Sequence, residues 1–201
     1  MKFFFPLFLL PFLCVKCCPW DDCEGADFLC DEFLPVLPQL VTAIPYQDGE
    51  TLRFRFEDDP EIFSVAAFRN EGLIGSQQCQ DEIFTVLQAT DSSRPFRITI
   101  STDTNGESLL NFVFSFDPPN QESLEFYRLE FNELGVSGVM PPLELRVVTD
   151  TVLAGVDYQD VGIISVPEAT EPGKISAFYY NEAGGLLRVE RIGAPSFFRI
   201  N

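Results

Sequence analysis

Residues 51–56 read Thr-Leu-Arg-Phe-Arg-Phe, a strict alternation of polar and apolar side chains. Successive side chains of a β-strand point to opposite faces of the sheet, so the leucine and both phenylalanines share one face and the two arginines share the other. The stretch therefore predicts a strand with one face on a hydrophobic core and the other face in water.

The same alternation recurs at Phe96–Ile100 and Asn111–Phe116, and more loosely at Leu143–Val148. Segments rich in Gly, Pro, Asn and Asp separate the alternating stretches, as expected for turns. These segments are residues 47–49, 103–106, 117–120, 171–173 and 183–185. We predict an all-β fold, an antiparallel β-sandwich or barrel, which can include one short helix.

Three further stretches, residues 61–68, 81–88 and 122–134, carry apolar residues that fit a helical period as well as a strand period. In the third, Tyr127 and Phe131 satisfy both patterns. We expect a strand there and leave the first two open, with a short helix that caps a barrel end or packs on a sheet as the alternative.

The beginning of the chain has the pattern of a secretory signal. Lys2 is followed by an unbroken apolar run, residues 3–13, and then by cysteines. The run is shorter than the roughly 20 apolar residues that a membrane-spanning helix needs. We expect residues 1–17 to be a signal peptide of the lipoprotein type, residues 18–45 a Cys- and Pro-rich linker, and residues 46–201 a single β domain.

Cys14 follows the apolar run directly, where a bacterial lipoprotein signal places the cysteine that receives the lipid. Leu13 is larger than the residue usually found before that cysteine, and Cys18, the alternative, has Lys16 inside its motif. We expect lipidation at Cys14 ahead of Cys18, which would hold the protein at the outer membrane or cell surface. Cleavage near Cys17 without a lipid would instead release a secreted protein.

The remaining cysteines fit disulfide bonds, which an exported compartment permits. Cys79 lies inside the predicted domain, and we expect Cys23 or Cys30 to be its partner. A zinc site is the alternative, but the cysteines do not form two CxxC pairs and the chain has no histidine.

Pro35, Pro38 and Pro45 interrupt the end of the linker. Because proline lacks a backbone N–H and disrupts the interior of helices and sheets, we predict no helix here. The segment is expected to be an extended connector whose leucines and valines lie on the domain.

The composition excludes several functions. The chain has 31 acidic and 13 basic residues, a formal net charge of −18, and nucleic-acid binding is excluded because it needs basic patches. The absence of histidine excludes Ser-His-Asp and Cys-His catalysis and histidine-ligated metals. A phosphate-binding loop and a dinucleotide fingerprint are also absent, so we expect no cofactor.

Acidic residues leave two weaker possibilities. Pairs such as Asp58-Asp59, Asp81-Glu82 and Asp157 with Asp160 have the residue types of a glycoside hydrolase, although so many acids make chance pairs common. We interpret each pair as part of a solvated face.

Residues 101–107 read Ser-Thr-Asp-Thr-Asn-Gly-Glu, with oxygen ligands at alternating positions as in a calcium loop. Asp103, Asn105 and Glu107 are therefore weak calcium candidates, and residues 157–160 are a weaker one. The twelfth position of an EF-hand would be Phe112 rather than glutamate, so we interpret the segment as a β-turn.

Residues 175–190 read Ile-Ser-Ala-Phe-Tyr-Tyr-Asn-Glu-Ala-Gly-Gly-Leu-Leu-Arg-Val-Glu. This order of an aromatic pair, a polar turn, glycine and two aliphatic residues resembles the closing hairpin of uncharacterised Bacteroidota envelope lipoproteins. The short signal that ends in a cysteine is similar as well. The resemblance implies an all-β envelope lipoprotein and implies no activity.

As a hairpin, this segment should place Tyr179 and Tyr180 on opposite faces, with the tight turn made by residues 184–185. Leu187 and Val189 should share one face.

The chain is thus expected to be an exported, lipid-anchored cell-envelope protein with a non-catalytic structural or ligand-binding role. Its partners are expected to be the membrane, through the lipid, and either an apolar small molecule or an envelope protein. The 21 phenylalanines can line a cavity inside a barrel, although solid packing is their commoner use. A secreted carboxylate-dependent glycoside hydrolase and a calcium-stabilised adhesion module are the alternatives.

Overall fold

The computed structural model describes residues 36–73, 81–89, 95–102, 109–116, 124–132, 135–139 and 142–200, all within one compact unit, Glu32–Asn201. The elements are α1 (Pro38–Ala43), β1 (Thr51–Phe56), β2 (Ile62–Leu73), β3 (Asp81–Ala89), β4 (Arg97–Thr102), β5 (Leu109–Ser115), β6 (Leu124–Asn132), β7 (Gly135–Val139), β8 (Glu144–Leu153), β9 (Val156–Ser165), β10 (Ile175–Asn181), β11 (Gly185–Arg191) and β12 (Ala194–Ile200).

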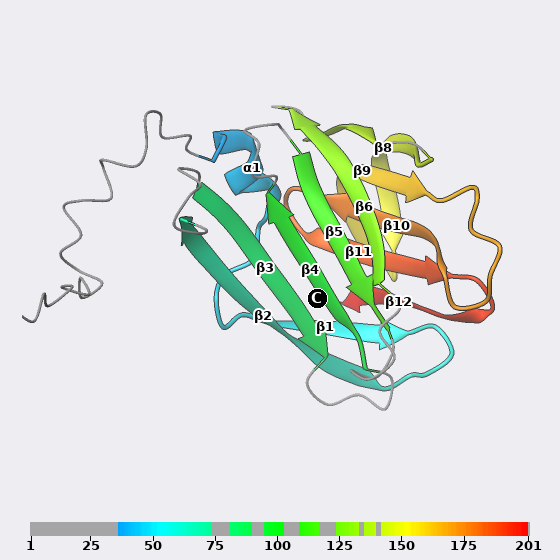
Figure 1. Cartoon of the computed structure of the whole chain (residues 1–201). Helices are drawn as coiled ribbons and strands as arrows, with labels where there is room; N and C mark the ends of the chain where they lie inside the picture. The colour runs from blue at the N-terminus through cyan, green and yellow to red at the C-terminus, as the bar shows by residue number, and fades with distance from the viewer. Residues whose placement is uncertain are drawn as a thin grey trace, which may run out of the picture. The chain divides into compact units, whose positions relative to one another are not determined.

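The strands form one antiparallel sheet in the order β7-β6-β5-β4-β3-β2-β1-β12-β11-β10-β9-β8. The first strand, β1, pairs with both β2 and the last strand, β12 (Figure 1). The two ends of the sheet approach each other, because Val136 Cγ2 of β7 lies 3.2 Å from where a Cβ on Gly162 of β9 would stand. No ladder joins these ends among the described residues, so the sheet is a nearly closed barrel, and the predicted all-β fold is confirmed.

The stretches with ambiguous periods are all strands. Residues 61–68 contribute to β2, residues 81–88 form most of β3, and residues 122–134 contain β6, so the expectation of a strand in the third is confirmed. The cleanly alternating stretches also form strands; in β1 the leucine and both phenylalanines are buried, as predicted.

Aromatic rings fill the interior of the barrel. They form two groups whose ring centroids lie 4.7–6.4 Å apart, and Phe116 contacts both groups. The first group contains Phe54, Phe56, Phe63, Phe96 and Phe197, and the second contains Phe112, Phe114, Tyr127, Phe131, Phe178 and Tyr180. The phenylalanines of these groups pack on one another, which is a commoner use of such rings than lining a cavity.

The prediction that prolines exclude a helix from residues 35–45 was wrong, because α1 lies there. Pro38 lies in the first turn, where the missing N–H has no helical acceptor in any case, so the helix tolerates it. Leu40, Ala43 and Ile44 are buried in the core, which makes this segment part of the β unit. No helix in the described part of the chain is long and apolar enough to cross a membrane.

Two side chains and one backbone N–H of the barrel hold this segment in place. Tyr180 donates its hydroxyl proton to Ala43 O, and Arg69 donates to Ile44 O and Tyr46 O. The Tyr46 hydroxyl accepts a hydrogen bond from Leu186 N at 2.5 Å. We call residues 38–46 the N-terminal plug, because they pack on one end of the barrel core.

The hairpin of β10 and β11 forms as predicted around Gly185, whose φ of 69° favours glycine. Tyr180 is buried and Tyr179 is partly exposed, on opposite faces. The prediction for Leu187 and Val189 was wrong: Val189 belongs to the main core with Leu186, whereas Leu187 lies in a smaller outer cluster. The register shifts between Tyr179 and Tyr180, so Leu187 has no direct cross-strand partner and its face is displaced.

Candidate functional site

Several residues singled out from the sequence lie outside the described residues and stay predictions. They are the lipidation candidates Cys14 and Cys18, the disulfide candidates Cys23, Cys30 and Cys79, and the calcium candidates Asp103, Asn105 and Glu107.

The acidic pairs that can be placed do not form a site. Asp59 Oδ1 accepts a hydrogen bond from Glu61 N at 2.9 Å and shapes the turn after β1. Asp157 and Asp160 lie on β9, where Asp160 has a φ of 51°. Within the described ranges, no three His, Cys, Asp or Glu side chains are grouped so that they can hold a metal ion.

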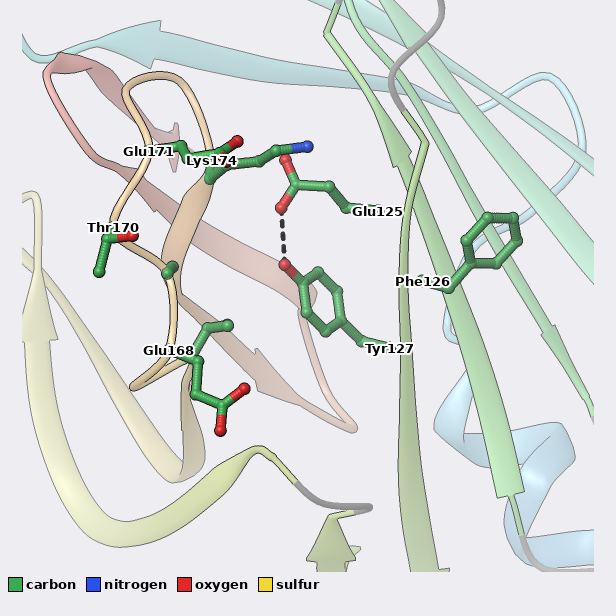
Figure 2. Close-up of a pocket in the computed structure, with 9 residues that line it drawn as sticks. Glu125, Phe126, Tyr127, Glu168, Thr170, Glu171 and Lys174 are labelled. Atoms are coloured by element: carbon green, nitrogen blue, oxygen red, sulfur yellow. Dashed lines mark hydrogen bonds between the residues drawn. The ribbon is translucent and has the colours of Figure 1, made fainter.

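Strand β6 instead borders two hollows, and both Phe126 and Tyr127 line each of them. Its side chains alternate, so Glu125 and Tyr127 point to one side while Phe126 points to the other (Figure 2). We call the hollow beside Glu125 and Tyr127 the seam pocket, and the hollow beside Phe126 and Arg128 the outer groove.

The seam pocket exists because β7 is short. It pairs with β6 only from Leu129 to Asn132, so among the described residues the first half of β6 has no strand on that side. The connection between β9 and β10, residues 166–174, faces this part of β6. The hollow has a volume of ≈ 320 Å³, in the lower range of small-molecule sites.

Glu125 ties the two walls of the seam pocket together. Its Oε2 accepts hydrogen bonds from the Tyr127 hydroxyl at 2.6 Å and from Ile175 N of β10 at 3.1 Å. Oε1 accepts none from the described residues, and the side chain is 9% exposed. One carboxylate oxygen therefore connects β6 with β10, where no strand pairing joins them among the described residues.

Tyr127 is held as a neutral donor. Burial raises the pKa of its hydroxyl far above the ordinary value, and the hydrogen bond to Glu125 raises it further. The ring also packs against Phe178, with centroids 5.6 Å apart. The phenol is therefore fixed in position and protonation state.

The loop opposite β6 is fastened at both ends. Val166 N donates to Ser176 O at 2.9 Å, and Gly173 N donates to Ile192 O at 2.6 Å. Arg191 donates from Nε to Gly173 O at 2.9 Å while its guanidinium lies over the Phe116 ring. The pocket wall is thus preorganised by backbone and side-chain contacts.

Glu168, Glu171 and Lys174 of this loop also line the seam pocket (Figure 2). With Glu125 they give three carboxylates against one ammonium. Such a set can accept hydrogen bonds from hydroxyl or amine groups, and a pair of carboxylates can in principle support acid–base chemistry.

The outer groove is built by strand register. Phe126 pairs across to Val113, while Arg128 pairs across to Asn111, which pairs on to Ser101. An apolar pair on β5 and β6 therefore lies beside a polar row that runs over β4, β5 and β6. Pro142 and Leu143, which precede β8, also line the groove, whose volume is ≈ 650 Å³.

Sequence reasoning missed both hollows. The signal for the seam pocket was Glu125 at a position that an alternating strand buries, but the mixed period of residues 122–134 concealed it. The outer groove depends on the register of three strands, which no local pattern specifies.

No protein-family model, curated protein or solved structure matches this chain. Its function is therefore inferred from its own residues.

Proposed function

We propose that this chain is an exported, lipid-anchored protein of the cell envelope whose β domain binds a ligand on its wall and carries out no catalysis. The observation that carries the binding role is the filled interior. Aromatic rings occupy the inside of the barrel, whereas the hollows that border β6 lie on the wall. A surface-binding module matches this distribution better than a carrier with an internal cavity does.

The envelope location rests on residues 1–17, where the apolar run ends at Cys14. A diacylglycerol and a fatty acid on this cysteine would provide firm anchoring, since each buried CH₂ contributes about 0.8 kcal/mol.

Intact mass spectrometry of the protein from its native envelope tests the anchor. We expect a mass that begins at Cys14 or Cys18 and includes a diacylglycerol and a fatty acid. Alkylation with and without reduction would count the disulfides in the same sample. An unlipidated mass that begins near Cys17 would overturn the anchored form of the proposal.

Glycoside hydrolysis is a second candidate, because Glu125 and Glu168 line the same hollow. Retaining enzymes place their carboxyl groups about 5–5.5 Å apart and inverting enzymes about 6.5–9.5 Å apart. Release of reducing ends from a panel of oligosaccharides tests this function, with Glu125→Gln and Glu168→Gln as the inactive variants and Glu144→Gln on β8 as the matched control. Turnover by the natural chain that both variants abolish would replace the binding role with an enzymatic one.

A further inference from the structure

We propose that the protein forms a two-fold symmetric dimer in which β8 pairs antiparallel with β8 of a second copy. This inference goes beyond the proposed function and does not rest on it, because it concerns the free edge of the sheet rather than either hollow.

The free edge of β8 is the first observation. β8 is one of the two end strands of the sheet, and among the described residues it pairs only with β9, along Glu144–Leu153. The backbone N–H and C=O groups that point away from β9 therefore have no described strand beside them. An edge of this kind is a template for pairing with another chain.

β7, across the seam, does not run along this edge. Val136 Cγ2 lies 3.2 Å from where a Cβ on Gly162 of β9 would stand. Gly162 pairs with Tyr180, whose side chain is buried in the core, so this contact lies on the inner face of the sheet. β7 therefore contacts the β8–β9 hairpin from inside and pairs with neither of its strands in the described part of the chain.

The two end strands differ in how well they can accept a partner. β7 has five residues, Gly135–Val139, two of which are glycines, and its register shifts against β6. Short, irregular edge strands discourage pairing between molecules. β8 has ten residues without glycine, proline or lysine, and five of them are β-branched. β8 is therefore the end strand that suits a second chain.

Valine side chains are exposed on both faces of β8. Val147 is 54% exposed and Val152 is 63% exposed, and their odd and even positions place them on opposite faces. A strand added beside β8 would cover both valines, because its own side chains stand on both faces of the new pair.

The geometry of two identical edges limits how they can pair. Along a strand, only every second residue directs its N–H and C=O toward the free edge, and such residues must lie opposite each other in a ladder. Two identical antiparallel strands meet this condition only where one residue lies opposite its own copy. Registers centred on Val148 and Thr149 give the longest overlaps, residues 144–152 and 145–153.

Charge favours the register centred on Val148. It places Arg146 opposite Asp150 of the second copy, twice because of the symmetry, and opposite charges across an antiparallel pair are stabilising. Both side chains are exposed, and neither forms an ion pair with any residue that the structure describes. The register centred on Thr149 would instead set Asp150 against Val148.

The remaining pairs of the favoured register are also compatible. Val148 lies opposite its own copy and Val147 lies opposite Thr149, so β-branched side chains pack across the interface. Glu144 faces Val152, so no like charges are opposed. The pair uses the β8 edge of both copies, and assembly therefore closes at a dimer.

Sedimentation equilibrium of the full chain, purified from its native envelope in density-matched detergent, tests the proposal. We expect the natural chain to be a dimer at micromolar concentration. Arg146→Glu and Asp150→Arg should each weaken dimerisation by about tenfold or more, because each change sets like charges face to face twice. The double variant restores opposite charges and should dimerise as the natural chain does. Arg97→Glu, at an exposed position of β4, is the matched control and should have no effect.

A cysteine at the proposed two-fold axis gives a second readout. Val148→Cys places two thiols opposite each other, within the Cα separation that a disulfide needs, about 4.4–6.8 Å. Val152→Cys is the control, because residue 152 would lie about 26 Å from its own copy. Non-reducing electrophoresis should show a reducible dimer for Val148→Cys that the natural chain and Val152→Cys lack.

Three outcomes would overturn the dimer: a monomeric natural chain throughout the micromolar range, a double charge variant that stays as weak as the single ones, or equal cross-linking of the two cysteine variants. The proposed function fails separately. An unlipidated mass or turnover of an oligosaccharide would remove parts of that function, whereas a lipidated monomer would remove only this inference.

Discussion

Tyr127 and Phe126 are neighbours in the sequence, yet they stand in opposite surroundings. Tyr127 packs on Phe178 and donates to a buried carboxylate, whereas the ring of Phe126 is largely in water. The inner side of β6 uses its residues to hold the barrel together at the seam. The outer side leaves the Phe126 ring exposed. The comparison separates stability from binding along a single strand.

The largest expected effect is on the free energy of unfolding, when an aromatic ring on the inner side of the barrel wall is removed and compared with one on the outer side. Phe178→Ala should lower the free energy of unfolding by about 3–5 kcal/mol, because Phe178 is fully buried and its removal leaves a cavity beside Tyr127. Phe126→Ala should change it by about 0.5 kcal/mol or less. Urea unfolding measures both. A large loss in Phe126→Ala would show that the outer side also supports the fold.

The next largest effect on the free energy of unfolding is expected for Glu125, the carboxylate at the seam. Glu125→Ala should lower the free energy of unfolding by about 3 kcal/mol, because Ile175 N and the Tyr127 hydroxyl lose a charged acceptor. Glu125→Gln keeps a carbonyl acceptor and should lose about 1 kcal/mol. Urea unfolding with the exposed Glu144→Ala as control checks this. An equal result for Ala and Gln would mean that the carbonyl acceptor that glutamine keeps contributes nothing.

Raising the pH tests how much the Tyr127 hydroxyl, which donates to Glu125 at the seam, contributes to stability. Burial raises the pKa of Tyr127, and likewise that of Tyr46 and Tyr180, so the folded protein favours the protonated phenols. Stability should be complete below the unfolded pKa of about 10 and fall as the pH rises above it, because unfolded tyrosines release protons there.

Absorbance at 295 nm and circular dichroism, recorded together against pH, follow this loss. Tyrosinate should appear only as the fold is lost, and Tyr127→Phe should make the decline shallower. Ionisation of all the tyrosines near pH 10 with an unchanged fold would contradict the described burial.

The smallest effect is expected for Tyr179 on the outer face of β10. The Tyr179 hydroxyl donates to Glu190 Oε1 at 3.0 Å, next to the ion pair of Arg188 with Glu57. These groups are partly exposed, so Tyr179→Phe should change the free energy of unfolding by about 0.5 kcal/mol or less in thermal or urea unfolding. A larger change would mean that polar contacts on the outer face also fasten the barrel.

The sequence predicted the fold class through strands that have one face on the hydrophobic core and the other face in water. Residues 51–56 and 111–116 alternate because their strands meet that condition, and the period alone identified them. Residues 122–134 gave no clear period, because Glu125 occupies an inward position and Phe126 an outward one. The residues that blurred the pattern are those that form the two hollows.

Other features depend on contacts distant in sequence. Pro38 was expected to prevent a helix, but a proline in the first turn is tolerated, and the helix is stabilised by burial of Leu40 and Ile44. Seam closure and groove register likewise depend on which strands become neighbours. No local pattern around Glu125 or Arg128 carries that information.

The N-terminal plug also restricts the order in which contacts can form during folding. Tyr180 reaches Ala43 across 137 residues and Leu186 reaches Tyr46 across 140 residues, while β1 has β12 as one of its two partners. The plug and β1 must therefore wait for β10, β11 and β12, which are synthesised later. Contacts of such long range slow folding, because the chain must close a large loop before they form. A chain that lacks β12 leaves one edge of β1 unpaired, so this part of the barrel can form only after β12 has been synthesised.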